Sequence, residues 1–254
     1  MHTALHMPTG VPHLSLQPPS CYQSTRDGVT FRVAETLEER LGALALVYNC
    51  YTEAGLMKPN YFGVRVLPQH LQPTTTILIG SYGPHVLCTA TIIEQGEMSL
   101  PLEQLYADEV KQRQDQGLKL AEVSCLACAR EHAPDSCTAA MLPQLIAYMG
   151  AYSLSFGVDR LVIAVHPRHC RYYCRRLQFR QFGEERQYSK VCDRPAVACE
   201  LPNIAEVLAS LIEGDPKMSL PQAHRRPAEL KADEQTKLRS MLMDTSESLV
   251  VAKL

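Results

Sequence analysis

The sequence predicts a mixed α/β fold, with about seven strands in one sheet and helices on both of its faces. Two apolar runs, LKLAEVSCLAC at 118–128 and DRLVIAVHP at 159–167, are typical of buried strands. The helical stretch 138–157 lies between them, so the three segments form a strand, a helix and a parallel strand. The first strand carries one carboxylate, Glu122, among apolar and small residues. A charge in a buried strand is costly unless it is paired or used, so we expect function to depend on Glu122.

Composition and charge exclude several classes of protein. The chain has 254 residues, of which 46% are hydrophobic and 20% charged, as in ordinary folded proteins. Its formal net charge of −2 gives no general case for nucleic-acid binding, and no apolar run reaches the roughly 18 residues of a membrane span. The first residues lack the features of a secretory signal. We therefore expect a cytoplasmic protein whose ten cysteines are reduced and packed as small hydrophobic residues.

The N-terminal part of the chain predicts an arm, a strand and a helix. Residues 1–28 are rich in Pro, His, Ser and Gln without periodicity, which predicts a disordered or loosely attached arm. An alternating strand follows at 29–35. Thr36 and Glu39 then have the spacing of a capping box, so a helix begins there and ends near Gly55.

The next part predicts a long loop, a hairpin and a short helix. Segment 56–74 has three prolines and no clear period, and a loop of this length in a compact domain is either functional or a misread element. The β-rich runs 74–82 and 85–94 meet at Gly83-Pro84, which favours a hairpin. Residues 99–117 then predict an amphipathic helix that ends at a glycine.

The remaining elements follow the two central strands. We expect a helix over 168–177 and strands over 179–191 and 196–201, which complete a domain spanning 29–202. Beyond it, 203–254 predicts a helical C-terminal extension. The sequence leaves open whether this extension covers the core, mediates self-association or stays mobile.

Three stretches of the chain carry a more specific signal. They are LVYNCYTEAG at 46–55, LPLEQLYADEVKQRQDQGLKLAEVSCLAC at 100–128 and IAVHPRHCRYYCRRLQF at 163–179. Together with the strand order, they resemble GNAT-type acyltransferases and, more narrowly, the long-chain N-acyl amino acid synthases, relatives of the acyl-homoserine-lactone synthases. The resemblance covers roughly residues 30–201. It implies a GNAT-like fold and an enzyme that joins a fatty acyl group, carried on acyl-carrier protein, to the amine of an amino acid.

Glu122 is the candidate general base of such a reaction. An α-amino group has a pKa of about 8 and is mostly protonated at neutral pH, so aminolysis of a thioester needs a proton acceptor. A positioned carboxylate contributes roughly 10²–10⁴-fold and works best if apolar neighbours raise its pKa. The alternative is that Glu122 forms a salt bridge with a nearby arginine at the strand edge.

The residues after Glu122 predict a binding edge for the pantetheine arm of the donor. Ser124, Cys125, Leu126 and Ala127 are small or neutral. The amides of the arm could pair with this backbone as an added strand would. A backbone N–H near Leu126 or Ala127 would then face the thioester carbonyl as an oxyanion donor. The alternative is an ordinary core strand.

Metal binding is not expected from the sequence. Cys125 and Cys128 form a C-x-x-C, but this spacing in a strand directs the two side chains to opposite faces. His166 and His169 lie close to Cys170, but a histidine before a helix more often caps the helix or is exposed.

The loop after the central strand indicates which donor is used. The run AREHAPDSCTAAML at 129–142 contains no glycine, whereas ordinary acetyltransferases have a Q/R-x-x-G-x-G/A loop there for the pyrophosphate of coenzyme A. This difference favours acyl-carrier protein over acyl-CoA and predicts no permanently bound cofactor. Arg130 and Ser136 could hold the single phosphate of a pantetheine arm.

A basic helix face is the candidate docking surface for an acidic carrier protein. Arg168, Arg171, Arg175 and Arg176 recur within one predicted helix of a nearly neutral chain. The alternative is a solvated face that pairs with the acidic residues of 183–185.

Tyr173, on the same predicted helix, sits where the GNAT-like fold often places the hydroxyl that protonates the departing thiolate. The alternative is a packing role beneath the strand. Other readings of the whole chain are an acyl-homoserine-lactone synthase, an acyl-CoA-dependent N-acetyltransferase, or a non-enzymatic module that binds carrier protein or lipid. We expect the acyl chain to lie between the first helix, segment 56–74 and the sheet.

Overall fold

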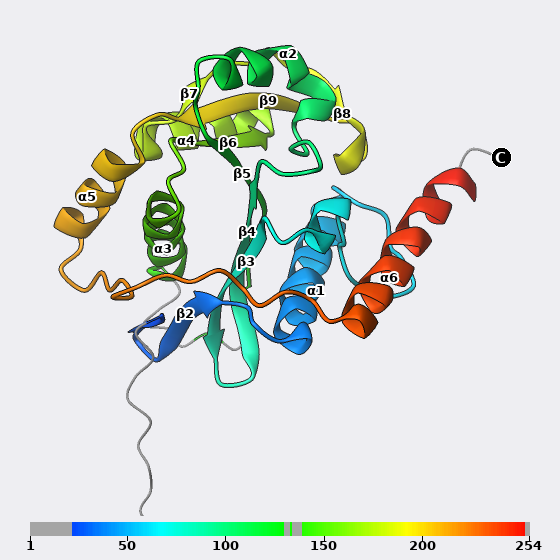
Figure 1. Cartoon of the computed structure of the whole chain (residues 1–254), viewed down its shortest axis with the longest axis horizontal. Helices are drawn as coiled ribbons and strands as arrows, with labels where there is room; N and C mark the ends of the chain where they lie inside the picture. Colours follow the sequence, from blue (N-terminus) through cyan, green and yellow to red (C-terminus); the bar gives the residue numbers. More distant parts are fainter. Residues whose placement is uncertain (1–21, 130–132, 134–138, 252–254) are drawn as a thin grey trace, which may run out of the picture.

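The computed structural model describes residues 22–129, 133 and 139–251. Their strands form one mixed sheet of nine strands in the order β1-β2-β3-β4-β5-β6-β9-β7, with β8 paired to β9. The sheet stands between α3 and α5 on one side and α1 and α6 on the other (Figure 1). The structure therefore has the predicted mixed α/β architecture. Within the described residues, no helix combines the length and apolarity needed to cross a membrane.

The bounds of the elements are as follows. The strands are β1 (Ser24–Arg26), β2 (Val29–Val33), β3 (Thr75–Tyr82), β4 (His85–Glu94), β5 (Leu120–Cys128), β6 (Arg160–Val165), β7 (Arg180–Gln181), β8 (Arg186–Tyr188) and β9 (Arg194–Leu201). The helices are α1 (Leu37–Glu53), α2 (Glu103–Gln114), α3 (Met141–Ser155), α4 (Pro167–Leu177), α5 (Ile204–Gly214) and α6 (Ala232–Val251), with short 3₁₀ helices η1 (Pro68–Leu71) and η2 (Ser189–Val191).

The first described residues correct part of the sequence prediction. The arm was expected to extend to residue 28, but β1 pairs with β2 in an antiparallel hairpin. Asp27 and Gly28 connect the two strands with positive φ angles of 49° and 84°. An Asp-Gly pair in this conformation is the favoured two-residue hairpin turn. Residues 22–28 therefore belong to the sheet, and 1–21 lie outside the described residues.

The first helix has the predicted boundaries. The Thr36 side chain accepts a hydrogen bond from the backbone N–H of Glu39, and the Glu39 carboxylate accepts one from the backbone N–H of Thr36, which completes the capping box. At the other end Gly55 has a φ of +66°, a left-handed conformation that favours glycine. The buried face of α1, including Leu44 and Val47, packs on the sheet.

Two predicted elements are shorter than expected. The strand predicted over 179–191 is divided into β7, β8 and η2. Gly183 explains the break, because a Cβ there would lie 2.5 Å from the ring of Tyr106, so the chain passes this ring where no side chain fits. α3 begins at Met141 rather than 138, which places Pro143 in the first turn, where proline is tolerated.

The C-terminal segment covers the core, which answers the question that the sequence left open. Ile204 and Val207 of α5 are buried in the same apolar cluster as α3. Leu238 and Met241 of α6 are buried against α1 and β3. Between these helices, Arg226 pairs with the buried carboxylate of Glu94 on β4.

The central strands separate at Glu122. β5 and β6 are parallel, as predicted, but pair only over Leu120–Arg160, Ala121–Leu161 and Glu122–Val162. Past this point β5 remains paired to β4, and β6 remains paired to β9. The two strands therefore open a split in the sheet immediately after the carboxylate.

Candidate active site

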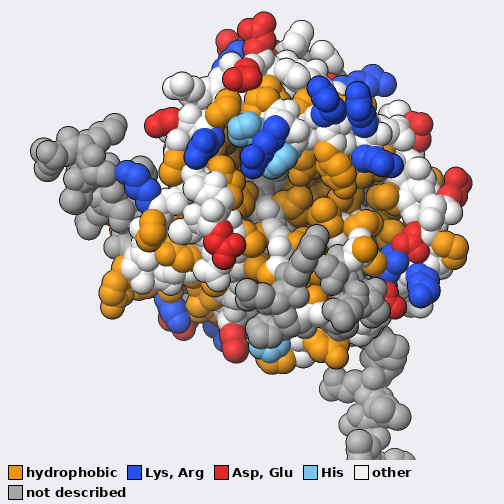
Figure 2. Space-filling view, turned by 180° about the vertical axis from the view of Figure 1, so that it is seen from behind, with side chains coloured by type: hydrophobic (Ala, Val, Ile, Leu, Met, Phe, Trp, Pro, Cys, Tyr) orange, Lys and Arg blue, Asp and Glu red, His pale blue; other side chains and the backbone are white. Residues whose placement is uncertain are grey.

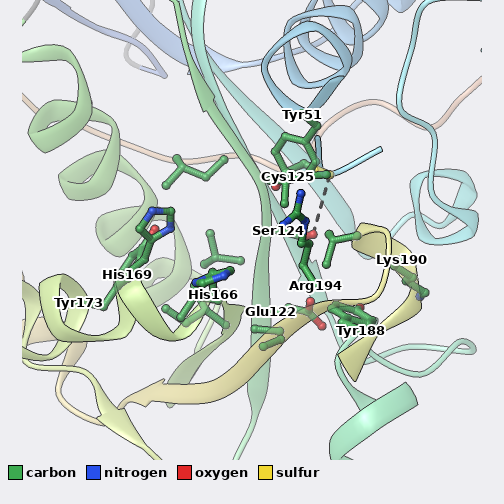
Figure 3. A pocket seen from close by; sticks show the side chains of 18 of the residues that line it. Tyr51, Glu122, Ser124, Cys125, His166, His169, Tyr173, Tyr188, Lys190 and Arg194 are labelled. Atoms are coloured by element: carbon green, nitrogen blue, oxygen red, sulfur yellow. Dashed lines mark hydrogen bonds between the residues drawn. The ribbon is translucent and has the colours of Figure 1, made fainter. Parts of the chain in front are cut away.

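A cavity of about 340 Å³ occupies the split between β5 and β6. Its wall on the α3 side is apolar, and the wall on the α1 side carries polar and aromatic side chains together with the apolar Leu56 and Leu67. Figure 3 shows His169 and Tyr173 to the left of β5, and Glu122, Tyr188 and Lys190 to its right. The cavity thus passes through the sheet and gives one space with two chemically different ends.

Glu122 lies in this cavity wall and is almost fully buried, with 3% of its surface exposed. Its Oε2 accepts a hydrogen bond of 2.7 Å from the backbone N–H of Leu102. Burial raises the pKa of Glu122 to about 8, although the Leu102 hydrogen bond and the charge of Lys190 act in the opposite direction. Among the described residues no arginine forms an ion pair with Glu122. The salt bridge considered from the sequence is therefore not formed in that part of the chain.

The backbone after Glu122 bends at a β-bulge. Thr91 of β4 is opposite Ser124, and Thr89 is opposite Ala127. β4 has one residue between Thr89 and Thr91, whereas β5 has two, Cys125 and Leu126, in the corresponding position. Cys125 has a φ of +51°. A bulge leaves one residue outside the regular ladder and redirects its backbone groups. Of the predicted binding edge, Ser124, Cys125 and Leu126 line the cavity, whereas Ala127 is buried beside it.

Tyr173 of α4 lines the same cavity as Glu122. Its ring packs against Phe179 at a centroid distance of 5.6 Å, so the packing contact considered from the sequence is formed. Burial raises the pKa of Tyr173 to about 12, which leaves the hydroxyl protonated at neutral pH. The structure therefore brings Tyr173 and Glu122 to one space from opposite sides of the sheet.

The beginning of α4 forms part of the mouth of the cavity. His166 is its N-cap, and its Nδ1 accepts a hydrogen bond of 3.2 Å from the backbone N–H of Arg168. This is the capping role expected for a histidine before a helix. His166, Arg168 and His169 all line the cavity.

The arginines of α4 remain in solvent. Arg168, Arg171, Arg175 and Arg176 are exposed. In the described part of the chain none of them forms an ion pair, and the acidic residues of 183–185 do not pair with this helix. On the face of the molecule shown in Figure 2, basic and histidine side chains border a hollow lined by apolar side chains. The two residues predicted to bind the phosphate of the pantetheine arm, Arg130 and Ser136, lie outside the described residues.

One pair of cysteines lies as the sequence predicted, and three other cysteines form a cluster that the sequence did not indicate. Cys125 and Cys128 belong to apolar clusters on opposite faces of the sheet, as predicted. Cys170, however, contacts Cys174 and Cys199, with Sγ–Sγ distances of 3.6 Å and 3.5 Å. The sulfur atoms of these three residues lie within 4.8 Å of one another, a spacing compatible with packed thiols and with ligands of a soft metal ion. None of the three lines the cavity.

Several cavity residues were not found from the sequence. Tyr51, Arg65, Tyr188, Lys190 and Arg194 come from α1, segment 56–74, β8, η2 and β9 and converge on the polar wall. The only local signal was at Arg65, a charged residue between two valines in a segment without other periodicity. Segment 56–74 thus contributes Leu56, Arg65 and Leu67 to the cavity lining, and its only helix or strand is the short η1.

Comparisons with known proteins give consistent results. The family model for the N-acyl amino acid synthase FeeM matches residues 42–202. The solved structure of FeeM, from uncultured soil microbes, has a TM-score of 0.59 at 27% identity, covering 70% of this chain and 92% of that one. BjaI, a CoA-dependent acyl-homoserine lactone synthase, has a TM-score of 0.55 at 13% identity, covering 79% and 91%. TofI, solved with an inhibitor, has a TM-score of 0.54 at 16% identity, covering 75% and 98%. No curated protein sequence matches the chain.

These matches confirm the family and fold that the sequence indicated. The FeeM model spans the chain from within α1 to the residue after β9, which includes every residue that lines the cavity. The two more distant structures share the fold alone. The chain therefore belongs to the FeeM family of N-acyl amino acid synthases, and it is an N-acyltransferase with a GNAT-like fold.

Proposed function

We propose that the protein transfers a long-chain fatty acyl group from acyl-carrier protein to the α-amine of an amino acid, giving an N-acyl amino acid. The observation that supports this reaction most strongly is Glu122, a buried carboxyl group with a raised pKa at the point where the sheet opens into a cavity. Its pKa of about 8 is close to that of an α-amine, so a proton passes between them at little cost in free energy.

The residues around Glu122 suggest the course of the reaction. The amine loses a proton to Glu122 and attacks the thioester carbonyl carbon, forming the C–N bond. Backbone N–H groups at the Cys125–Leu126 bulge stabilise the oxyanion of the tetrahedral intermediate. The C–S bond then breaks as the carbonyl re-forms, and the nitrogen releases its second proton to water. The thiolate of the pantetheine arm leaves and takes up a proton from water, or from the Tyr173 hydroxyl, which water then reprotonates.

The apolar end of the cavity suits a fatty acyl chain. It is lined from α3, β6, α4 and the residues after α4, by Leu145, Ile146, Met149, Ile163, Leu177 and Phe179. From the sequence, the acyl chain was expected between the first helix, segment 56–74 and the sheet. Those elements form the polar wall, so we assign the acyl chain to the α3 side and the amino acid to the α1 side.

The donor is proposed to be acyl-carrier protein because the exposed arginines of α4 stand beside the cavity. Arg168 belongs to both the helix face and the cavity wall, so a carrier docked on α4 would place its pantetheine arm near β5. An acyl-CoA donor is the second candidate. It is favoured by the similarity to BjaI, whose structure contains S-adenosylmethionine and isopentyl-CoA.

The test is a product assay with purified protein. Dodecanoyl-acyl-carrier protein and dodecanoyl-CoA are supplied separately, each with the twenty amino acids and S-adenosylmethionine, and the products are identified by mass spectrometry. We expect N-dodecanoyl amino acids, formed much faster from the carrier protein. Equal rates with both donors would reject the carrier-protein assignment. Acyl-homoserine lactone as the main product would replace the proposed reaction with that of the lactone synthases.

A further inference from the structure

We propose that Arg65 and Lys190 form the subsite that binds the α-carboxylate of the acceptor amino acid. This inference rests on the proposed function, because it assigns the polar wall of the same cavity to one part of one substrate. It is carried by the position of both cations in the cavity wall and by the burial and hydrogen bonding of Arg65.

Arg65 is a buried cation held in the cavity wall. It is 9% exposed, lies between the buried residues Val64 and Val66, and its backbone N–H donates to the Leu44 carbonyl of α1 at 3.1 Å. Its Nη2 donates to the backbone carbonyl of Lys190 at 3.1 Å, and its guanidinium lies 4.8 Å from the ring centre of Tyr51. Its Nε is buried and has no hydrogen-bond partner among the described residues.

The positive charges of Arg65 and Lys190 are not balanced by any of the residues that the structure describes. No carboxylate in the described residues forms an ion pair with Arg65 or Lys190. His70 is near Arg65, but burial lowers its pKa to about 3, so it is neutral and adds no charge. Glu122 is near Lys190, but a group with a pKa of about 8 is mostly uncharged at neutral pH. The polar wall therefore carries excess positive charge, which is costly to bury without an anion.

An amino acid supplies the anion that this wall lacks, together with the amine that the reaction needs. Its ammonium group would face Glu122, and its carboxylate would accept hydrogen bonds from Arg65 and Lys190. Lys190 interacts electrostatically with both Glu122 and Arg65, so the proton acceptor and the anion subsite are adjacent. In an α-amino acid, the amine nitrogen and the carboxylate carbon are likewise close together, because both are bonded to the α-carbon. Figure 3 shows Glu122, Tyr188 and Lys190 together on this side of β5.

The test compares acceptors that differ only at the carboxylate. The best amino-acid acceptor from the product assay is measured beside its primary amide and its decarboxylated amine, for the wild type, Arg65→Met and Lys190→Met. Arg40→Met is the matched control, because Arg40 is an equally buried arginine on α1 (8% exposed) that does not line this cavity.

We expect Arg65→Met to raise the KM for the amino acid by roughly 10–100-fold, the usual effect of losing a charge-assisted hydrogen bond. The amide and the amine should react poorly in the wild type and change by less than about threefold in the variant. Equal loss with all three acceptors, as a folding defect would give, overturns the proposal. A raised KM for the acyl donor instead would assign Arg65 to the phosphate of the donor and also overturn it.

A binding measurement separates this inference from the proposed reaction. If the wild type acylates no acceptor, the proposed function fails, but the anion subsite is still tested by calorimetry with N-dodecanoyl-glycine and N-dodecanoyl-glycinamide. The subsite is supported if the wild type and Arg40→Met bind N-dodecanoyl-glycine more tightly than N-dodecanoyl-glycinamide and Arg65→Met does not. Equal affinity of the wild type for the two compounds rejects it.

Discussion

Glu122 shows how one side chain acquires its chemistry from its surroundings. The strand buries it, the backbone N–H of Leu102 fixes its orientation, and the separation of β5 from β6 gives it access to the cavity. The carboxylate of a solvent-exposed glutamate would be fully ionised at neutral pH and too weak a base to take a proton from an ammonium group.

Replacing Glu122 with glutamine tests the proposed base. A glutamine Oε1 can still accept the hydrogen bond from Leu102, so the fold should be retained. We expect Glu122→Gln to lower kcat by roughly 10²–10⁴-fold while acyl-donor binding remains within about threefold of the wild type. Glu38→Gln is the control, since Glu38 is an exposed carboxylate in the first turn of α1 and lies outside the cavity lining. Unchanged turnover in Glu122→Gln would reject the base assignment.

The raised pKa of Glu122 also predicts a pH dependence of stability. The folded protein keeps the Glu122 proton up to about pH 8, whereas the unfolded chain releases it near the ordinary value of 4.5. Glu122 therefore contributes fully to the free energy of unfolding below about pH 4.5, and this contribution is lost as the pH rises through about 8. In chemical denaturation the free energy of unfolding of the wild type, relative to that of Glu122→Gln, should fall over this interval. Parallel curves for the two proteins would contradict the buried, protonated state.

At the scale of elements, the site depends on the way two neighbouring strands diverge. β5 supplies Glu122 and the bulge, and β9 and η2 supply the facing polar wall. α4 places Tyr173 in the cavity and leaves its arginines outside. The helix thus connects the interior of the site with an exposed basic surface.

That surface gives a prediction about the donor. Because Arg171 and Arg175 are exposed on α4, reversing both to glutamate should weaken binding of acyl-carrier protein by about tenfold or more and reduce its dependence on salt. The control is Lys237→Glu with Arg239→Glu, the same change of charge on the exposed face of α6, away from α4. Equal binding by the two double variants, measured by surface plasmon resonance across salt concentrations, would exclude docking on α4.

At the scale of the whole molecule, the N- and C-terminal segments complete the core instead of being appended to it. β1 extends the sheet at one edge, and the segment after β9 returns across the molecule to bury Leu238 against α1 and β3 (Figure 1). Arg226 in this segment pairs with Glu94, which is 3% exposed. The helices after residue 203 therefore pack against the core, which is one of the arrangements that the sequence left open.

This packing predicts the effect of shortening one buried side chain in α6. Leu238 is 1% exposed, so Leu238→Ala should lower the free energy of unfolding by about 2–5 kcal/mol. Lys237→Ala, at the neighbouring exposed position, should change it by no more than about 0.5 kcal/mol. Chemical denaturation of both variants provides the measurement. Equal stability would show that α6 does not contribute to the folded core in solution.

The sequence alone determined the features that local patterns encode. The capping box at Thr36 and Glu39, the hairpin at Gly83-Pro84 and the parallel pair of central strands were predicted because each depends on neighbouring residues or on one repeated period. Glu122 was identifiable for the same reason, since a single charge in an apolar strand is a local anomaly.

Only the tertiary structure decided how the rest of the site is assembled. Arg65 and Lys190 are 125 positions apart, and both are separated from Glu122 by more than fifty residues, so no local pattern relates them. The bulge at Cys125 and the limited pairing of β5 with β6 also depend on what the neighbouring strands do. A side chain's burial and partners arise from long-range packing, which is why the proposed base was visible in the sequence and the pocket around it was not.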